Sequence, residues 1–310
     1  MASASPTSSS ARGLVMTASA FLIWGVVPVY MKLLGHMPAM EIVAHRILWA
    51  VPFTAAILAF LGGFKTLWPV FRQPKTLALA GVTATIISVN WGLYVYAIIS
   101  GHALDAALGY YINPLVNVVM GAVFLGERPT RAQLGAIVLA VAGVAVMTWA
   151  AGGLPWISLV LAFSFGTYGL LRKILPIGAA EGFFVEVLLL LLPCLAVVAW
   201  TFADGTRHFA TGTTDTLLLI GAGPITAVPL ILFAAGARAL DYSTVGILQY
   251  IAPTMVFITA VFFFGEPFSS VDLVAFGLIW LAVAIYVWSM LRESRARRAA
   301  ARAAEAGCLT

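Results

Sequence analysis

Long apolar stretches, separated by short polar segments that contain Gly or Pro, run along almost the whole chain. Ten of them predict membrane-spanning helices at about residues 14–34, 40–61, 77–99, 104–125, 131–150, 155–175, 181–203, 216–238, 244–264 and 271–291. A helix of about 20 apolar residues spans the hydrocarbon core of a bilayer. The stretches are too long and too uniformly apolar for the strands of a membrane barrel. The pattern therefore predicts an all-α polytopic membrane protein with ten transmembrane helices.

Composition excludes a water-soluble globule. Of the 310 residues, 62% are hydrophobic and 9% are charged, and the mean hydropathy is +1.02. Soluble domains carry about 25% charged residues, so this chain lacks the charge to cover a soluble surface. The formal net charge of +5 does not indicate nucleic-acid binding, because a run of arginines follows the last apolar stretch. Such a basic tail is expected to meet the anionic lipid of the bilayer.

Lys and Arg are distributed unevenly between alternate loops. If the N-terminus lies inside, the cytoplasmic side holds Arg12, Lys65, Arg72, Lys75, Arg128, Arg131, Arg172, Lys173, Arg238 and the tail arginines Arg292, Arg295, Arg297, Arg298 and Arg302. The other side holds Lys32 and Arg207. Cytoplasmic loops of membrane proteins carry an excess of Lys and Arg. An even number of spans with both termini in the cytoplasm is therefore predicted.

Two motifs occur once in each half of the chain. The matching segments, each pair 139 residues apart, are Tyr111-Ile112-x-Pro114 with Tyr250-Ile251-x-Pro253, and Gly126-Glu127 with Gly265-Glu266. Their prolines, glycines and glutamates are candidate structural residues. The matches indicate that spans one to five and spans six to ten are copies of one unit.

Each copy has five spans, and because five is odd the second copy must insert upside down relative to the first. The sequence thus predicts two inverted five-helix repeats, an architecture of secondary transporters whose substrate site lies near the bilayer midplane. The predicted organisation is a disordered segment at 1–12, a first repeat at 13–150, a second repeat at 151–291 and a basic cytoplasmic tail at 292–310.

Ionisable residues within the spans are expected to have a specific role, because a charge there costs about 2.5–3.5 kcal/mol on insertion scales. The candidates for charge binding or proton coupling are Glu41, His45, Arg46 and Glu186. Glu41 and His45 share a helix face, and Glu186 matches His45 at an offset of 141. Histidine titrates near about pH 6.5, so a protonated His45 can compensate a carboxylate. A structural pair or a water-exposed vestibule explains the same residues equally well.

Polar and aromatic residues share helix faces in several spans, which favours surfaces that line a cavity. The candidates for substrate binding or cavity lining are Trp24, Asn90, Trp91, Tyr94, Tyr111, Asn113, Gln249 and Tyr250. Such surfaces suit an uncharged or zwitterionic organic molecule. Helix–helix hydrogen bonding and interfacial anchoring of aromatic rings are the alternatives.

Common catalytic and nucleotide-binding motifs are missing. The sequence has no G-x-x-x-x-G-K-S/T loop, no H-E-x-x-H helix and no G-x-S-x-G elbow. Its two cysteines, Cys194 and Cys308, give neither a disulfide framework nor metal spacing. We therefore expect no cofactor, no metal and no enzymatic activity. A small-molecule substrate and the lipid bilayer are the expected partners.

Further motifs carry a family resemblance. They are Trp24-Gly25 with Pro28 and Lys32, Glu41-Ile42-x-x-His45-Arg46-x-x-Trp49, Asn90-Trp91, Leu108-Gly109-Tyr110-Tyr111-Ile112-Asn113-Pro114-Leu115-Val116-Asn117, Phe124-Leu125-Gly126-Glu127-Arg128, Ala162-Phe163-Ser164-Phe165 with Tyr168-Gly169, and Gln249-Tyr250-Ile251-x-Pro253-Thr254. In this order, over about residues 13–290, the chain resembles the EamA branch of the drug/metabolite transporter superfamily.

The resemblance implies a bacterial inner-membrane protein with two inverted five-helix repeats around a central cavity. It also implies secondary transport, often export, of small organic molecules such as drugs or metabolites, and some members are named for chloramphenicol sensitivity. We expect alternating access, with proton coupling as one mechanism. A passive facilitator or channel, a membrane enzyme and a structural or sensory subunit stay open as alternatives. Substrate, direction, coupling ion and oligomeric state are not predicted.

Overall fold

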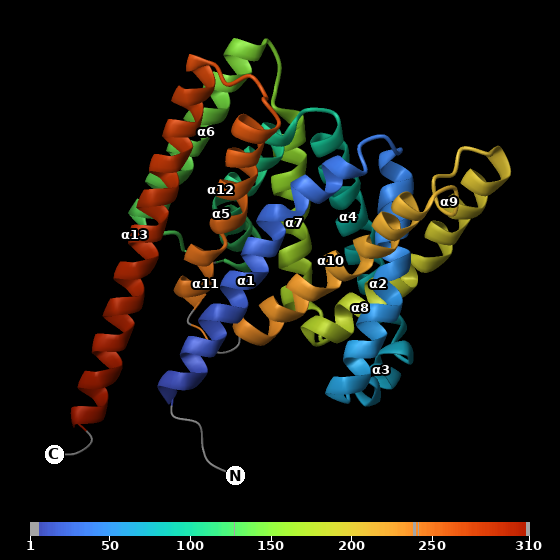
Figure 1. Ribbon diagram of the computed structural model, residues 1–310. Helices are drawn as coiled ribbons and strands as arrows, with labels where there is room; N and C mark the ends of the chain where they lie inside the picture. Colours follow the sequence, from blue (N-terminus) through green and yellow to red (C-terminus); the bar gives the residue numbers. More distant parts are fainter. Residues whose placement is uncertain (1–5, 127, 238–239, 241, 308–310) are drawn as a thin grey trace.

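The computed structural model describes residues 6–126, 128–237, 240 and 242–307. Every regular element in these ranges is helical: α1 (Pro6–Leu33), α2 (Ala39–Leu61), α3 (Phe64–Phe71), α4 (Pro74–Ile99), α5 (Ala103–Leu125), α6 (Arg131–Ala151), α7 (Trp156–Ile174), α8 (Ala179–Leu189), α9 (Leu191–Asp204), α10 (Thr213–Ala237), α11 (Tyr242–Leu248), α12 (Ile251–Ile258), the π-helix η1 (Thr259–Phe263) and α13 (Ser270–Gly307). Figure 1 shows a bundle in which the start of α1 and the end of α13 lie at the same end.

Most of these helices are long and apolar enough to cross a bilayer. Seven segments qualify alone, within α1, α2, α4, α5, α6, α10 and α13, and α8 with α9 qualifies as an eighth, bent span. Helix α7 and the α12–η1 segment are apolar but shorter. The described chain thus confirms the predicted class, an all-α polytopic membrane protein.

Several helices end where the sequence has its glycine breakers. Gly62 and Gly126 follow α2 and α5 with φ angles of 68°, in the left-handed region that closes helices. The next long helix, α6, starts with a capping box in which Thr130 and Gln133 satisfy each other's backbone N–H groups. These local signals set the loop between the fourth and fifth predicted spans.

Helices extend into regions outside the predicted spans. The sequence predicts disorder over residues 1–12, whereas α1 already begins at Pro6, since proline is well suited to the first turn of a helix. Residues 1–5 lie outside the described chain. The predicted tail at 292–310 continues α13 as far as Gly307. A short helix, α3, also fills the loop after α2 and buries Leu67 and Val70.

Two predicted spans are broken helices. The span at 181–203 bends by 43° between α8 and α9, and Pro193 lies in the first turn after the bend. The span at 244–264 is interrupted between α11 and α12, with Pro253 in the first turn of α12, and then continues as η1. A proline ring clashes with the carbonyl four residues earlier and removes one helical hydrogen bond. The residue four before Pro193 is Leu189, the last residue of α8, and the residue four before Pro253 is Gln249, which follows α11. Both breaks therefore lie where a proline disturbs the preceding turn.

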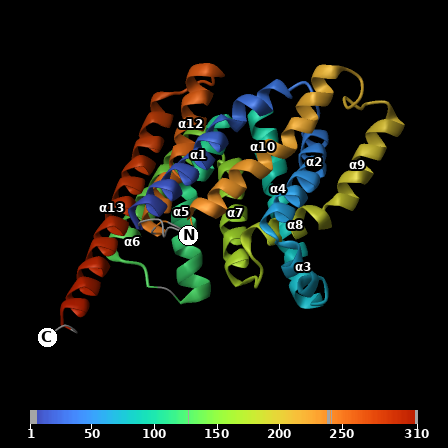
Figure 2. The ribbon, with the colours of Figure 1, turned by 60° about the horizontal axis from the view of Figure 1, so that its bottom comes forward.

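Helices from the two predicted halves are interleaved. The most extensive contacts join α6 to α13, α5 to α7, and α10 to both α1 and α2, and each pair combines one helix from before residue 151 with one from after it. Figure 2 shows α6 and α13 together at one edge and α9 at the opposite edge. The buried core therefore lies between the halves, and polar groups in that core come from both.

Gly223 allows α10 to approach α2 closely. A Cβ atom at this position would lie 2.5 Å from the backbone carbonyl carbon and oxygen of Trp49, whereas nothing lies within 4 Å of a Cβ at Gly277 in α13. We predict that Gly223→Ala destabilises the protein by about 1–3 kcal/mol through overpacking. The check is the melting temperature of the detergent-solubilised protein. Gly277→Ala is the matched control, and equal melting temperatures for both variants would contradict this packing.

Candidate functional site

Glu186 in α8 is a fully buried carboxylate with three partners. Its Oε1 accepts a hydrogen bond of 2.7 Å from the Thr83 hydroxyl of α4, and its Oε2 accepts one of 3.0 Å from the Tyr168 hydroxyl of α7. Nη1 of Arg172, also from α7, lies 3.7 Å from Oε1. The side chains of Glu186 and Arg172 are 1% and 15% exposed. These four residues, here called the Glu186 cluster, neutralise a carboxylate inside the protein.

Arg46 in α2 forms the centre of a second group. Its Nε donates a 2.7 Å hydrogen bond to Oγ1 of Thr226 in α10, and its guanidinium carbon lies 5.0 Å from the centre of the Trp91 ring. The phenol groups of Tyr94 and Tyr110 lie within electrostatic range of the guanidinium. Arg46 is 5% exposed. We call these five residues the Arg46 cluster.

A row of aromatic rings joins the two clusters. Tyr94 contacts Tyr110 with ring centres 5.7 Å apart, and Tyr110 contacts Phe165 at 6.1 Å. Phe165 in turn contacts Tyr168 of the Glu186 cluster at 6.0 Å. A buried cation and a buried carboxylate therefore lie at the two ends of one aromatic path through the protein.

The structure pairs Glu41 with a residue that the sequence pattern does not indicate. His208, in the segment between α9 and α10, reaches Oε2 of Glu41 with its Nδ1 at 2.8 Å and donates its backbone N–H to Oε1 at 2.8 Å. His45 stacks on Phe209 with ring centres 4.8 Å apart, and neither of its ring nitrogens has a hydrogen-bond partner among the described residues. The structure thus does not bring His45 and Glu186 together as a pair.

Tyr111 and Tyr250 lie in another contact between the halves. Their rings stack with centres 6.3 Å apart, and the Tyr111 hydroxyl is 2.8 Å from Oγ1 of Thr254 in α12. Gln249 and Tyr250 occupy the break between α11 and α12. Asn113 is buried in α5, and its Nδ2 lacks a partner among the described residues. These four predicted candidates are therefore gathered near α5 and the broken helix.

Two predicted cavity-lining residues take part in helix packing. Asn90 is fully buried and donates from Nδ2 to the Leu161 carbonyl at 3.1 Å and to Oγ of Ser164 at 2.8 Å, both in α7. Trp24 packs against Phe21 and Phe233, with ring centres 5.4 and 5.8 Å away. Hydrogen bonding and ring packing between helices account for these contacts.

The repeated Gly-Glu motif has a structural role in its second copy. Both carboxylate oxygens of Glu266 accept hydrogen bonds from the first turn of α5, at 2.7 Å from the Ala103 N–H and 2.8 Å from the Leu104 N–H. Gly265, like Gly126, has a positive φ angle. Glu127 lies outside the described residues. Pro114 lies inside α5, and Pro253 is buried in the first turn of α12.

Several site residues are missed by sequence reasoning. Thr226, Thr83 and His208 carry no distinctive motif, and only the folded chain brings them to Arg46, Glu186 and Glu41. Arg172 is predicted as a cytoplasmic loop residue, whereas it is the ion-pair partner of Glu186. Its position four residues after Tyr168, on one helix face, is the signal that points to a shared partner.

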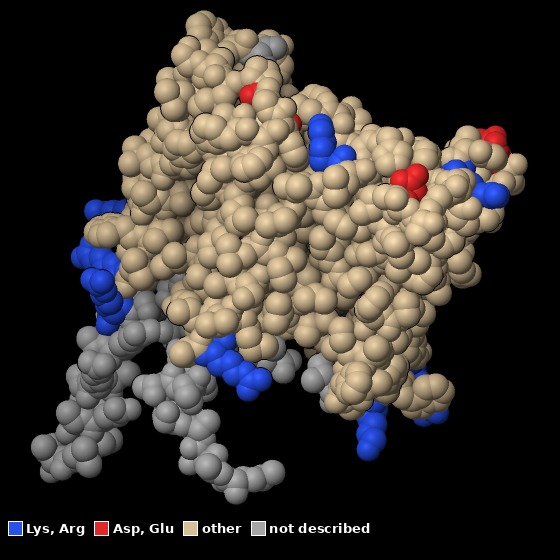
Figure 3. Space-filling model, in the orientation of Figure 1, with Lys and Arg blue, Asp and Glu red and all other residues tan. Residues whose placement is uncertain are grey.

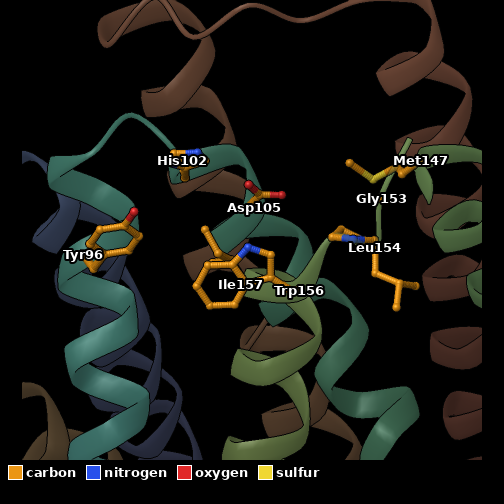
Figure 4. A pocket seen from close by; sticks show the side chains of 9 residues that line it. Tyr96, His102, Asp105, Met147, Gly153, Leu154, Trp156 and Ile157 are labelled. Carbon is orange, nitrogen blue, oxygen red and sulfur yellow. The ribbon is translucent and has the colours of Figure 1, made fainter. Parts of the chain in front are cut away.

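A hollow of about 270 Å³ lies apart from these clusters, between the facing ends of α4, α5 and α7. Figure 4 shows His102 and Asp105 near the Tyr96 and Trp156 rings, with Leu154 and Met147 to the side. None of the residues singled out as site candidates lines it. The hollow is therefore lined by residues other than those that the sequence predicts for the substrate cavity.

Comparisons with known proteins agree with this architecture. A model described as the EamA-like transporter family matches residues 11–149. A protein named as an uncharacterized transporter of Pseudomonas aeruginosa is 44% identical over 292 residues, covering 93% of this chain and 97% of its own. Protein RarD of Escherichia coli is 41% identical over 286 residues, covering 92% and 96%.

A more distant relative, the chloramphenicol-sensitive protein RarD of Pseudomonas aeruginosa, is 34% identical over 295 residues, covering 93% of this chain and 98% of its own. One solved crystal structure of a protein is similar with a TM-score of 0.60 at 19% identity, over 90% of this chain and 98% of that one. At that identity the similarity concerns the fold alone.

Apolar helices around a few buried charges define a multi-pass helical membrane protein. With relatives this similar over nearly their whole length, the chain belongs to the EamA-like transporter family and is a homologue of the RarD proteins. The resemblance expected from the motifs is confirmed. Several relatives are named as transporters, which is consistent with a protein that is not an enzyme.

We predict that Arg172→Met destabilises the protein, because it leaves Glu186 buried without its cationic partner. The expected loss is about 3–5 kcal/mol, the cost of removing one partner of a buried ion pair. Combining Arg172→Met with Glu186→Gln should cost less than the sum of the two single changes, since the pair acts as a unit. Melting temperatures of the four proteins test this, and strict additivity would contradict the pairing.

We predict that Glu266→Ala destabilises the protein by about 1–2 kcal/mol, because two N–H groups at the start of α5 lose their acceptor. Glu266→Gln keeps one side-chain acceptor and should fall between Glu266→Ala and the native protein. Asp204→Ala, at an exposed helix end, is the control. Thermal unfolding in detergent measures all three, and a Glu266→Ala variant as stable as the control would disprove the cap.

Proposed function

We propose that the protein is a secondary transporter that exports small organic molecules, such as drugs or metabolites, across the bacterial inner membrane by alternating access. The observation that carries the proposal is the Arg46 cluster. It combines a buried cation, an indole ring and phenol groups between apolar helices of both halves. An ionisable group that is kept at bilayer depth despite its cost is a hypothesis for a functional site. The transporter names of the relatives support the same proposal.

Ten spans in two inverted repeats remain our reading of the fold. On this reading, the shorter α7 and the α11–α12–η1 segment also cross the membrane and bring the eight spans identified by length to ten. Helix α1 runs upward in Figure 1 and α7, its proposed counterpart, runs downward. Contacts agree with such a pairing, because α1 packs on α10 as α7 packs on α4, and α5 packs on α7 as α12 packs on α1.

Surface charge supports cytoplasmic termini. In the face shown in Figure 3, the end of the bundle that holds α3 carries Lys and Arg but shows no Asp or Glu among the described residues, whereas the opposite end shows Asp and Glu together with some Lys and Arg. The ends of α1 and α13 lie toward the basic end. The cytoplasmic side of membrane proteins is the one enriched in Lys and Arg. Arg238 and the side chains of Lys173, Arg297, Arg298 and Arg302 lie outside the described part.

Hydrogen bonds between the halves offer the contacts that alternating access would break and re-form. Arg46 to Thr226 and Thr83 to Glu186 each join the first half to the second. In a proton-coupled mechanism, protonation of Glu186 would remove its charge and weaken its attraction for Arg172. His45 is the second candidate, because both ring nitrogens are free of described partners.

The test is uptake of labelled chloramphenicol and a panel of amino acids into proteoliposomes, with and without an imposed pH gradient. We expect gradient-driven accumulation above that of protein-free vesicles. The Glu186→Gln variant should lose most of it, and Glu181→Gln, on the same helix, should keep it. Flux that only equilibrates would indicate a passive facilitator. An absence of flux across the whole panel would contradict transport of these molecules.

A further inference from the structure

The buried ionisable residues of the described chain differ in whether they have an ion-pair partner. Glu41 has His208 as its partner, and Glu186 has Arg172. Arg46 has no Asp or Glu within ion-pair distance among the described residues, although it is 5% exposed and always charged. Thr226, its hydrogen-bond partner, is neutral and also donates to the Ala222 carbonyl. A buried guanidinium in this state has its positive charge uncompensated by the protein.

Two buried hydrogen-bond donors on this part of α2 are unused. Nη1 of Arg46 is buried and has no hydrogen-bond partner in the described chain, and the same holds for Nε1 of Trp49, one turn further along α2. Buried polar groups normally have partners, because each unmade hydrogen bond costs about 1–3 kcal/mol. A guanidinium that has an unused donor and no carboxylate partner is suited to binding an anionic oxygen. Guanidinium binds carboxylate especially well, since its planar fork matches both oxygens.

The surroundings of Arg46 indicate what else the bound molecule carries. The Trp91 ring lies 5.0 Å from the guanidinium carbon, and Tyr94 and Tyr110 begin the aromatic path toward Phe165. Rings on one side of a cation suit a molecule with an aromatic or apolar body next to its charged group. The carboxylates that would attract an ammonium group, Glu41 and Glu186, are already paired.

We propose that Arg46 binds the carboxylate of the transported molecule, so that the preferred substrates are organic monoanions with an aromatic or apolar body. The proposal rests on the proposed transport function and narrows its substrate class. It departs from the uncharged or zwitterionic substrate that the sequence alone suggests, because Arg46 has no carboxylate partner among the described residues, whereas Glu41 and Glu186, the carboxylates predicted as site residues, both have partners. Bound substrate would supply the missing acceptor for Arg46 Nη1.

The experiment compares three probes that share one aromatic body. N-acetylphenylalanine is an anion near about pH 7, N-acetylphenylalaninamide is neutral and phenylalanine is a zwitterion. Binding to the purified full-length protein in detergent is followed by tryptophan fluorescence and by the shift in melting temperature. We expect the anion to bind at least about tenfold more tightly than either of the other two. Equal affinities, or binding of none of the three, would overturn the proposal.

Variants of Arg46 test whether this residue causes the preference for the anion. Arg46→Gln should abolish the advantage of the anion, and Arg46→Lys, which keeps the charge but not the planar fork, should retain part of it. Arg72→Gln is the matched control, because Arg72 also lies 5.0 Å from a tryptophan ring, that of Trp68, but is exposed. An unchanged preference in Arg46→Gln would refute the assignment. The comparison of probes on the native protein stands even if that variant fails to fold.

Failure of the proposed carboxylate site and failure of the proposed transport function give different experimental results. Gradient-driven uptake of neutral chloramphenicol without preferential binding of the anion would leave the proposed function intact and overturn the carboxylate site. Preferential binding of the anion that depends on Arg46, without flux in proteoliposomes, would support the site and count against transport.

Discussion

The cost of an unsatisfied polar group in hydrocarbon is the constraint on which this structure depends. It forces the backbone into helices, whose hydrogen bonds are internal. It also influences where the few polar side chains go, because a polar group is stabilised when it finds a partner inside the protein. Asn90 bonds to α7, Glu266 to the start of α5, and Glu186 to Thr83 and Arg172. The polar residues therefore act as fixed points that align apolar helices with one another.

Many of these fixed points join the two halves of the chain. Hydrophobic packing between helices in lipid gives little direction, since lipid tails are as apolar as the side chains they replace. Hydrogen bonds such as Tyr111 to Thr254 or Glu41 to His208 do give direction, because they need one register. Interleaved halves held in this way cannot move independently. A relative movement of the halves must exchange polar partners, and a ligand or proton that binds those partners would bias the movement.

The sequence predicts the class of fold well and the site only in part. Apolar periodicity and Gly breakers suffice for the helices because they are local signals. The broken spans at Leu190 and Gln249 are missed, since Pro28 and Pro114 lie within unbroken helices and proline alone does not decide. The charged candidates are identified by their cost in lipid, but their partners are not. Pairs such as Arg46 with Thr226 depend on helix contacts that no short motif encodes.

The proposed duplication would account for the arrangement of the helices better than for the buried charges. At the offset of 141, the charged face of α2 does not repeat: His45 matches Glu186, and Arg46 matches Val187. The two buried groups also differ in their contacts: Nη1 of Arg46 has no hydrogen-bond partner among the described residues, whereas Glu186 is paired with Arg172. If Arg46 binds an anionic substrate as proposed, one of these buried charges is satisfied by the protein and the other by a ligand.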